Sequence, residues 1–342
     1  MKTFVLHTEQ GDIYAYTIKN EEIEVTALNY GASITSIKTK DRNGTFENVV
    51  AAYDHMQDYI LKPDPYLNAL VGPVAGRIAH GKYMLDEELQ QLSINNGINH
   101  LHGGKSGISK KFFDVMEKEN GLEFFLETDH VEDGYKGTFV YKISYILEGN
   151  TLRIEYTCIP EEKTLLNMTS HMYFNLSGDM KRSVYDQYLM IPSTKKLKIH
   201  KDGYPCQIEE IEKESAFDFQ VSKNIKENFD KGSNEFHLTK GYDTPFLLDK
   251  GNTICLEDPV SQRKLSIITD QSCVVVYSAN YFDDGMILNG NHKAYPFCAI
   301  ALETQDMPNG INIAKEKSNQ IFDREHPYHQ TTRYVFSNGG IK

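Results

Sequence analysis

The sequence predicts an all-β protein, built as one large antiparallel sandwich or barrel with few, short helices. Three observations lead to this prediction. Short segments of alternating apolar and polar residues recur along the 342 residues, Gly and Asn turn signals separate them, and long stretches of helical periodicity are missing. The 21 Tyr and 17 Phe residues supply the bulk that suits a pleated, half-buried surface. Because long helices do not alternate with the strands, a βαβ fold is not expected.

The clearest predicted strand pair lies between residues 138 and 158. Every second residue is apolar from Phe139 to Leu147, and the same alternation returns from Leu152 to Cys158. Gly149-Asn150 separates the two halves and predicts a turn between antiparallel strands. Asn120-Gly121, a strong hairpin signal, predicts a second strand pair over residues 111–118 and 122–128.

The other predicted elements are shorter and lie on both sides of these hairpins. Strands are expected at residues 13–19, 23–29, 33–38, 188–191, 246–248, 253–256, 264–269, 274–278, 299–303 and 331–336. Only residues 56–61 and 222–229 show the spacing of a short helix. No internal repeat, linker or shift in composition divides the chain, so we expect a single domain over residues 1–342.

Composition and charge argue against several classes of partner. The net charge of -12 disfavours nucleic acid, which requires clustered Lys and Arg, and it provides no polybasic membrane patch. No apolar run reaches the length of a membrane span, and the first residues lack the apolar core of a signal peptide. Five widely spread cysteines favour reduced thiols. We therefore expect a cytoplasmic protein, a monomer or homodimer, with neither nucleic-acid nor membrane partners.

One segment, Met168 to Leu176, combines a predicted buried strand with several polar side chains. If the segment is extended, Thr169, His171 and Tyr173 lie on one face. Burying polar groups without partners costs roughly 1–3 kcal/mol each, so this face requires partners from elsewhere in the chain. Taken alone, the segment fits equally well a core strand that holds one satisfied histidine.

Two further segments place basic side chains close to glycines. In Gly72 to Ile78, two glycines and a proline fix a tight backbone path that delivers Arg77 from a short loop. In Asn99 to Gly104, His100 and His102 are two residues apart and would share a face on a strand. Taken alone, Arg77 fits an ordinary surface arginine.

Two more segments carry carboxylates next to apolar residues. Gly241 to Phe246 places Asp243 in a predicted turn before a strand, where Asp also serves as an ordinary turn residue. In Ala299 to Gln305, an apolar run delivers Glu303 at the predicted end of a strand. A carboxylate in that position would meet solvent or a cleft.

Alternative interpretations of these segments have weaker support. His100 and His102 could begin a metal site, but a third ligand would have to come from a distant part of the chain. Gly104-Lys105-Ser106 resembles the end of a phosphate loop, yet position 99, where that pattern requires glycine, is Asn. Cys273 and Cys298 sit in apolar strands, which fits small core residues rather than a nucleophile.

The remaining combination is a histidine with a carboxylate, surrounded by groups suited to a polar ligand. A His and a Glu on opposite sides of a small molecule can act as an acid–base pair, which supplies roughly 10²–10⁴-fold acceleration. Hydroxyl, amide, guanidinium and carboxylate groups suit a polyhydroxylated ligand such as a sugar. The chain has no Trp, so Tyr and Phe would provide any stacking surface.

The five segments, in this order, resemble the aldose 1-epimerase (galactose mutarotase) family across essentially the whole chain. A sixth segment near the start, NYGA at residues 29–32, also resembles the sequence pattern of this family. The matching segments are GPVAGRI at 72–78, LHGG at 101–104, HMYFNL at 171–176, GYDTPF at 241–246 and LETQ at 302–305. One such segment would be weak evidence, whereas five in the same order are specific.

The resemblance implies a fold, a reaction and roles for particular residues. The fold would be the large antiparallel β-sandwich of galactose mutarotase, the supersandwich, with a sugar cleft across one sheet. His171 would protonate the ring oxygen of the sugar, and Glu303 would act as base on the anomeric hydroxyl. Arg77, His102 and Asp243 would hold sugar hydroxyls or the surroundings of His171. The substrate would be a free aldose of carbohydrate or galactose metabolism, and no cofactor or metal would be required.

The chain departs from the family pattern at Pro73, Gly76, Ser170 and Met172, where the family often has other residues. None of these departures removes a proposed proton carrier, but they bear on which sugar fits. Two other functions stay open: a non-catalytic sugar-binding or sensing protein, and a phosphosugar epimerase of the same fold. A glycoside hydrolase, with Asp243 and Glu303 as its two carboxylates, is less expected.

Overall fold

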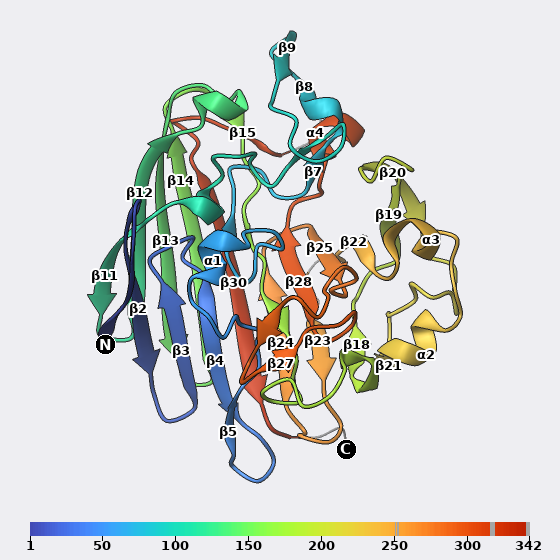
Figure 1. The fold of residues 1–342 in the computed structure, drawn as a ribbon. Coiled ribbons are helices and arrows are strands. Elements are labelled where there is room, and N and C mark those ends of the chain that lie inside the picture. The colour runs from blue at the N-terminus through green and yellow to red at the C-terminus, as the bar shows by residue number, and fades with distance from the viewer. Residues whose placement is uncertain (250, 252, 315–318, 340–342) are drawn as a thin grey trace.

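The computed structural model describes residues 1–249, 251, 253–314 and 319–339, and antiparallel sheets make up its fold (Figure 1). The largest sheet has nine strands in the order β11-β12-β13-β14-β30-β24-β23-β18-β21. Their bounds are β11 (Asp114–Lys118), β12 (Gly121–Asp129), β13 (Thr138–Glu148), β14 (Thr151–Pro160), β30 (Tyr328–Ser337), β24 (Lys264–Thr269), β23 (Ile254–Glu257), β18 (Tyr188–Met190) and β21 (Lys223–Asn224).

A five-stranded sheet formed by the N-terminal residues packs against one part of the nine-stranded sheet. Its strands follow chain order: β1 (Lys2–Thr8), β2 (Gly11–Lys19), β3 (Ile23–Leu28), β4 (Ile34–Lys40) and β5 (Phe46–Asn48). Val25 and Ile37 of this sheet share one buried cluster with Tyr145 of β13, and the Tyr145 hydroxyl donates to the Ala32 carbonyl over 2.7 Å. The core therefore lies between the two sheets.

A six-stranded sheet covers another part of the nine-stranded sheet. Its order is β17 (Tyr173–Phe174), β28 (Ile300–Gln305), β25 (Cys273–Tyr277), β22 (Asp243–Leu247), β19 (Lys195–Ile199) and β20 (Pro205–Glu210). Val274, Val276 and Leu302 enter the same buried cluster as Tyr334 of β30. Thr304 and Thr332 join the two sheets through their hydroxyls at 2.8 Å.

The opposite face of the six-stranded sheet is free to line a site, because side chains alternate along each strand. Glu303 and Gln305 on β28 point away from the core, as do Val275 and Tyr277 on the neighbouring β25. The register sets Val275 opposite Glu303, and Asp243 of β22 opposite Tyr277. Strand alternation thus gathers residues from three separate regions of the chain on one surface.

Short elements complete the fold and lie mainly in connections. The remaining two-residue strands are β6 (Leu70–Val71), β7 (Arg77–Ile78), β10 (His100–Leu101), β15 (Thr164–Leu165), β16 (Thr169–Ser170), β26 (Ile287–Leu288), β27 (His292–Lys293) and β29 (Ile321–Phe322). The strands β8 (Lys82–Leu85) and β9 (Glu88–Gln91) form a hairpin. The α-helices are α1 (Asp58–Leu61), α2 (Ile225–Phe229), α3 (Phe236–Thr239) and α4 (Gly310–Ile313). None of the helices in the described residues is long and apolar enough to cross a membrane.

The predicted all-β fold is confirmed, and the clearest sequence patterns identify the correct strands. β13 and β14 pair as expected, and their apolar residues alternate into the core. β11 and β12 form the hairpin that Asn120-Gly121 predicts. Both predicted helices exist but are shorter. The sequence does not predict the helices α3 and α4 or several strands, among them β1, β5, β8, β9, β19 and β20. Strands β19 and β20 have mixed charged and apolar residues, which obscure their alternation.

The segment around His171 differs from the single strand that its sequence predicts. It forms two separate pieces, since β16 pairs with β6 whereas β17 pairs with β28 of the six-stranded sheet. His171 and Met172 lie between them. The histidine thus occupies a junction between two different pairings rather than the middle of one ladder.

A buried ion pair joins β5 to the turn before β24, and its removal should destabilise the fold. Arg263 is 2% exposed and donates to the Glu47 carboxylate over 2.9 Å. Glu47→Ala leaves that guanidinium without its charge partner, so we expect a loss of about 3 kcal/mol. Urea unfolding measures this loss. Glu24→Ala, which removes the more exposed pair with Lys38, should cost under about 1 kcal/mol, and equal losses would contradict the prediction.

Candidate active site

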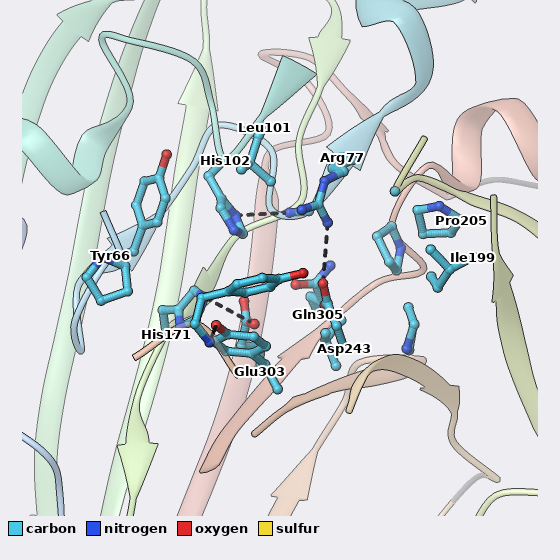
Figure 2. A pocket seen from close by; sticks show the side chains of 18 of the residues that line it. Tyr66, Arg77, Leu101, His102, His171, Ile199, Pro205, Asp243, Glu303 and Gln305 are labelled. Atoms are coloured by element: carbon cyan, nitrogen blue, oxygen red, sulfur yellow. Dashed lines mark hydrogen bonds and ion pairs between the residues drawn. The ribbon is translucent and has the colours of Figure 1, made fainter. Parts of the chain in front are cut away.

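A cleft of about 810 Å³, including its open mouth, lies over the free face of the six-stranded sheet (Figure 2). Its lining includes all five side chains that the sequence singled out: Arg77, His102, His171, Asp243 and Glu303. These residues come from five separate segments, so the fold brings together the groups that the sequence leaves far apart.

The most buried part of the cleft holds His171 and Glu303 side by side. The Nε2 atom of His171 lies 3.3 Å from Oε1 of Glu303, and the two side chains are only 6% and 4% exposed. Glu303 was expected at the end of a strand, but it lies inside β28 and points into the cleft because of strand alternation. Tyr173 stacks on the His171 ring with 4.9 Å between ring centroids and fixes one of its faces.

Burial shifts the pKa values of this pair in opposite directions. Desolvation lowers the pKa of His171 to about 4. Desolvation also raises the pKa of Glu303 well above its usual range, and the nearby charge of Asp243 adds to this rise while Arg77 opposes it. Both shifts therefore favour the uncharged form of each side chain.

The backbone around His171 is fixed by the segment that ends in β6. The His171 amide donates to the Ala69 carbonyl over 2.9 Å, and the Asn68 amide donates to the His171 carbonyl over 3.1 Å. The Asn68 side chain in turn accepts from the Tyr173 amide over 2.8 Å. These bonds replace the strand ladder at His171 and hold its backbone between the two strand pairings.

Arg77 and Asp243 form a second charged pair nearer the mouth of the cleft. Their closest atoms, Nη1 and Oδ2, are 3.6 Å apart, and both side chains are about a quarter exposed. Asn96 accepts a hydrogen bond from Nε of Arg77 over 2.9 Å and orients the guanidinium. Asp243, expected in a turn, is the first residue of β22. Both side chains keep hydrogen-bonding capacity for a ligand.

His102 lies close to the His171 pair and is held by Gly76. The Gly76 amide donates to Nδ1 of His102 over 3.2 Å, so the proton of the neutral ring is on Nε2. Burial lowers the pKa of His102 well below its usual range, and the neighbouring His171 and Arg77 lower it further. The neutral ring can therefore donate a hydrogen bond from Nε2. Its centroid lies 5.4 Å from the centroid of the His171 ring.

His100 and His102 do not share a face, contrary to the sequence-based expectation. His102 has a φ of 51°, so the chain turns immediately after β10 and the two rings separate. The His100 ring instead contacts the Ser93 carbonyl at 2.8 Å and the Tyr135 hydroxyl at 2.9 Å. Within the described ranges, no group of three or more His, Cys, Asp or Glu side chains is arranged to hold a metal ion.

Several cleft residues were not singled out from the sequence. Tyr66 packs edge-on against His102 at 4.6 Å and lies over His171 at 6.2 Å. Tyr277 and Gln305 line the floor of the cleft, and Ile199 and Pro205 form an apolar side. Gln305 belongs to the LETQ segment and shares the strand face of Glu303, a signal that could have identified it. Tyr66, in an irregular loop, gave no such signal.

Of the four departures from the family pattern, only Gly76 lines the cleft. Ser170 and Met172 are fully buried on the other side of the chain from His171. Met172 belongs to the core cluster. The residues that flank His171 therefore affect packing behind the site, whereas Gly76 bears directly on the shape of the cleft.

The burial of His171 predicts its titration. We expect the imidazole to gain its second proton near pH 4, because the buried site disfavours the charged ring that forms as the pH falls. Nitrogen shifts of the ¹⁵N-labelled side chain, followed by NMR between pH 3 and 8, measure this directly. His171→Gln identifies the resonance. A midpoint near the usual 6.5 would contradict the prediction.

Comparisons with known proteins agree with this geometry. The family model for aldose 1-epimerase matches residues 14–335. The galactose mutarotase of Sus scrofa is 32% identical over 332 residues, covering 96% of this chain and 95% of the relative. The aldose 1-epimerase of Haemophilus influenzae is 32% identical over 303 residues, covering 86% and 87%. The structure of galactose 1-epimerase from Lactobacillus acidophilus superposes with a TM-score of 0.86 at 25% identity, covering 99% of each chain.

Proposed function

The chain belongs to the aldose 1-epimerase family, and we propose that it interconverts the α and β anomers of free aldoses such as glucose and galactose. It is thus an isomerase that works by acid–base catalysis. One observation supports the proposed chemistry above all others: a buried histidine and a buried glutamate lie 3.3 Å apart in a cleft lined by polar groups. Such a pair can take a proton from one oxygen and give a proton to another within the same substrate.

In the proposed reaction, Glu303 removes the proton of the C1 hydroxyl while His171 protonates the ring oxygen. The bond between C1 and the ring oxygen breaks, and C1 becomes an aldehyde. Rotation about the C1–C2 bond presents the other face of the carbonyl. Closure then follows in reverse: His171 takes the proton back from the former ring oxygen as that oxygen bonds to C1, and Glu303 returns a proton to the carbonyl oxygen on C1. No proton or electron is gained or lost overall.

The directions of both pKa shifts are compatible with this reaction. Neutral His171 with protonated Glu303, the uncharged forms that burial favours, holds the same number of protons as an imidazolium with a carboxylate. A single proton transfer between the two side chains therefore produces the acid and the base that ring opening requires. Hydrogen bonds from sugar hydroxyls to the two side chains would stabilise the pair of imidazolium and carboxylate that this transfer produces.

Arg77, Asp243 and His102 are the proposed sugar-binding residues. The Arg77–Asp243 pair offers both donors and acceptors, and neutral His102 offers one Nε2 donor. Because they lie on the same cleft as the proton carriers, they can hold the ring while C1 faces His171 and Glu303. Tyr66 and Tyr277 supply apolar surface for the C–H faces of a sugar.

The rival functions find less support in the cleft. A phosphosugar would call for two or more convergent cations, whereas Arg77 is the one Arg or Lys among the described lining residues and is already paired with Asp243. A sugar sensor would not require the buried acid–base pair. We propose one domain, cofactor-free chemistry, a monomer or homodimer, and a cytoplasmic location. Five free cysteines, four of them buried, support a reducing compartment.

The direct test is the optical rotation of fresh α-galactose and α-glucose solutions. We expect the purified protein to accelerate the approach to anomeric equilibrium with both sugars, in proportion to enzyme concentration. The decay in buffer alone gives the baseline. If the protein binds either sugar but leaves the decay at the buffer rate, it is a binding protein and the proposed function is wrong.

Substitution of the two proton carriers should reduce turnover much more than sugar affinity. Glu303→Gln and His171→Gln keep side-chain size but cannot exchange the required protons, so kcat should fall by at least about 100-fold while KM changes little. Steady-state polarimetry separates the two constants. Glu257→Gln and His329→Gln, which alter residues outside the cleft, serve as matched controls. An effect confined to KM would assign both residues to binding.

A further inference from the structure

A buried carboxylate outside the cleft, Asp133, makes four hydrogen bonds to the surroundings of His102. It ends the short turn η3 (Val131–Asp133) and is 1% exposed. Oδ1 accepts from the Lys105 amide at 2.9 Å and the Ser93 hydroxyl at 2.5 Å. Oδ2 accepts from the Ser106 amide at 2.7 Å and its hydroxyl at 2.5 Å. Burial alone would raise the pKa of Asp133, but the bonds from Ser106 and Ser93 more than offset it, so the pKa is lowered.

The loop that Asp133 binds begins at His102 and has an unfavourable backbone conformation. His102, Gly103 and Gly104 have φ values of 51°, 79° and 86°, three consecutive left-handed residues. Left-handed φ costs about 1–3 kcal/mol in a residue that has a side chain, so His102 requires support from its surroundings. At Gly104 a Cβ atom would lie 2.2 Å from the Asp133 carboxyl, which shows how closely the loop is drawn onto it.

Two histidine–tyrosine pairs complete the same network from behind. The His130 ring lies between the Ser106 carbonyl at 3.1 Å and the Tyr141 hydroxyl at 2.9 Å. The His100 ring bridges the Ser93 carbonyl and the Tyr135 hydroxyl in the same way. Each serine that donates to Asp133 is therefore itself fixed by a buried histidine. A buried polar network with its hydrogen bonds made holds one conformation.

We propose that Asp133 is a positioning residue that acts on the sugar through His102. Its carboxylate fixes the loop of residues 103–106, and this loop holds His102 where its ring accepts from Gly76 and keeps the proton on Nε2. Asp133 does not line the cleft and touches no reacting group. The proposal rests on the proposed function only in that His102 binds the substrate.

Asp133→Asn is the sharpest change, because each carboxylate oxygen accepts from one backbone amide. An asparagine has one oxygen and one NH₂ group, so whichever way it turns, the Lys105 or the Ser106 amide faces a donor. The loop then loses one of its two backbone anchors. The experiment is a double-mutant cycle between Asp133→Asn and His102→Ala, measured as kcat/KM for anomer conversion.

We expect Asp133→Asn to lower kcat/KM about tenfold when His102 is present, roughly the worth of one hydrogen bond, with most of the change in KM. In the His102→Ala background the same substitution should change kcat/KM less than twofold. The same factor in both backgrounds, or no effect in the first, would overturn the proposal.

Asp258→Asn is the matched control for lost stability. Asp258 is also 1% exposed; its Oδ1 accepts from the amides of Val260 and Ser261, Arg182 donates to both of its oxygens, and it lies outside the cleft. The Asp258→Asn variant should have a lower melting temperature but an unchanged kcat/KM. If Asp133→Asn does not fold, Ser106→Ala, which keeps both backbone anchors and removes one hydroxyl, should give a smaller loss that also disappears with His102→Ala.

A second readout separates this proposal from the proposed function. ¹⁵N NMR of the His102 ring reports its tautomer and the hydrogen bond at Nδ1. We expect a pure Nε2–H tautomer in the wild type and a mixed tautomer, with a shifted Nδ1 signal, in Asp133→Asn. Unchanged ring signals would refute positioning by Asp133. A wild type that leaves sugar rotation at the buffer rate would instead refute the proposed function.

Discussion

The site depends on one constraint: an acid and a base, His171 and Glu303, are buried side by side and shielded from water. In bulk water Glu303 would be ionised near neutral pH and His171 would exchange between its charged and neutral forms, but burial disfavours charge on both. Both side chains are thereby biased toward their uncharged forms, 3.3 Å apart. Such an arrangement costs folding free energy, and the surrounding sheets supply the rigidity that keeps the two side chains together.

The fold meets this constraint through strand alternation and through strand interruption. On β28, β25 and β22 every second side chain points to the core while its neighbours point to the cleft, so one sheet serves both packing and chemistry. Glu303 and Asp243 come from regular strands of this kind. His171 comes from a break between two short strands, where backbone bonds to Asn68 and Ala69 replace a ladder. The rigid strand carries the carboxylate, and the junction brings the imidazole to it.

Local sequence patterns identified the strands that alternate regularly, such as β13 and β14, and the segments that carry the five predicted side chains. These patterns do not identify features that depend on contacts between residues far apart in the sequence. The divergence of His100 from His102 follows from a left-handed residue after β10, which no periodicity reveals. Asp133 resembles any acidic turn residue until the fold places it against residues 103–106. Tyr66 reaches the cleft from an irregular loop for the same reason.

The close approach of Gly76 to Pro308 also restricts which substitutions these two positions can accept during evolution. A Cβ atom at position 76 would lie 2.6 Å from Cβ of Pro308, and Gly76 has a φ of 73°. A side chain at position 76 therefore requires both a residue that tolerates left-handed backbone and a displaced segment at 308. The two positions, 232 residues apart in sequence, are not free to diverge independently. Among related chains the residues at these two positions, which both line the cleft, should therefore covary.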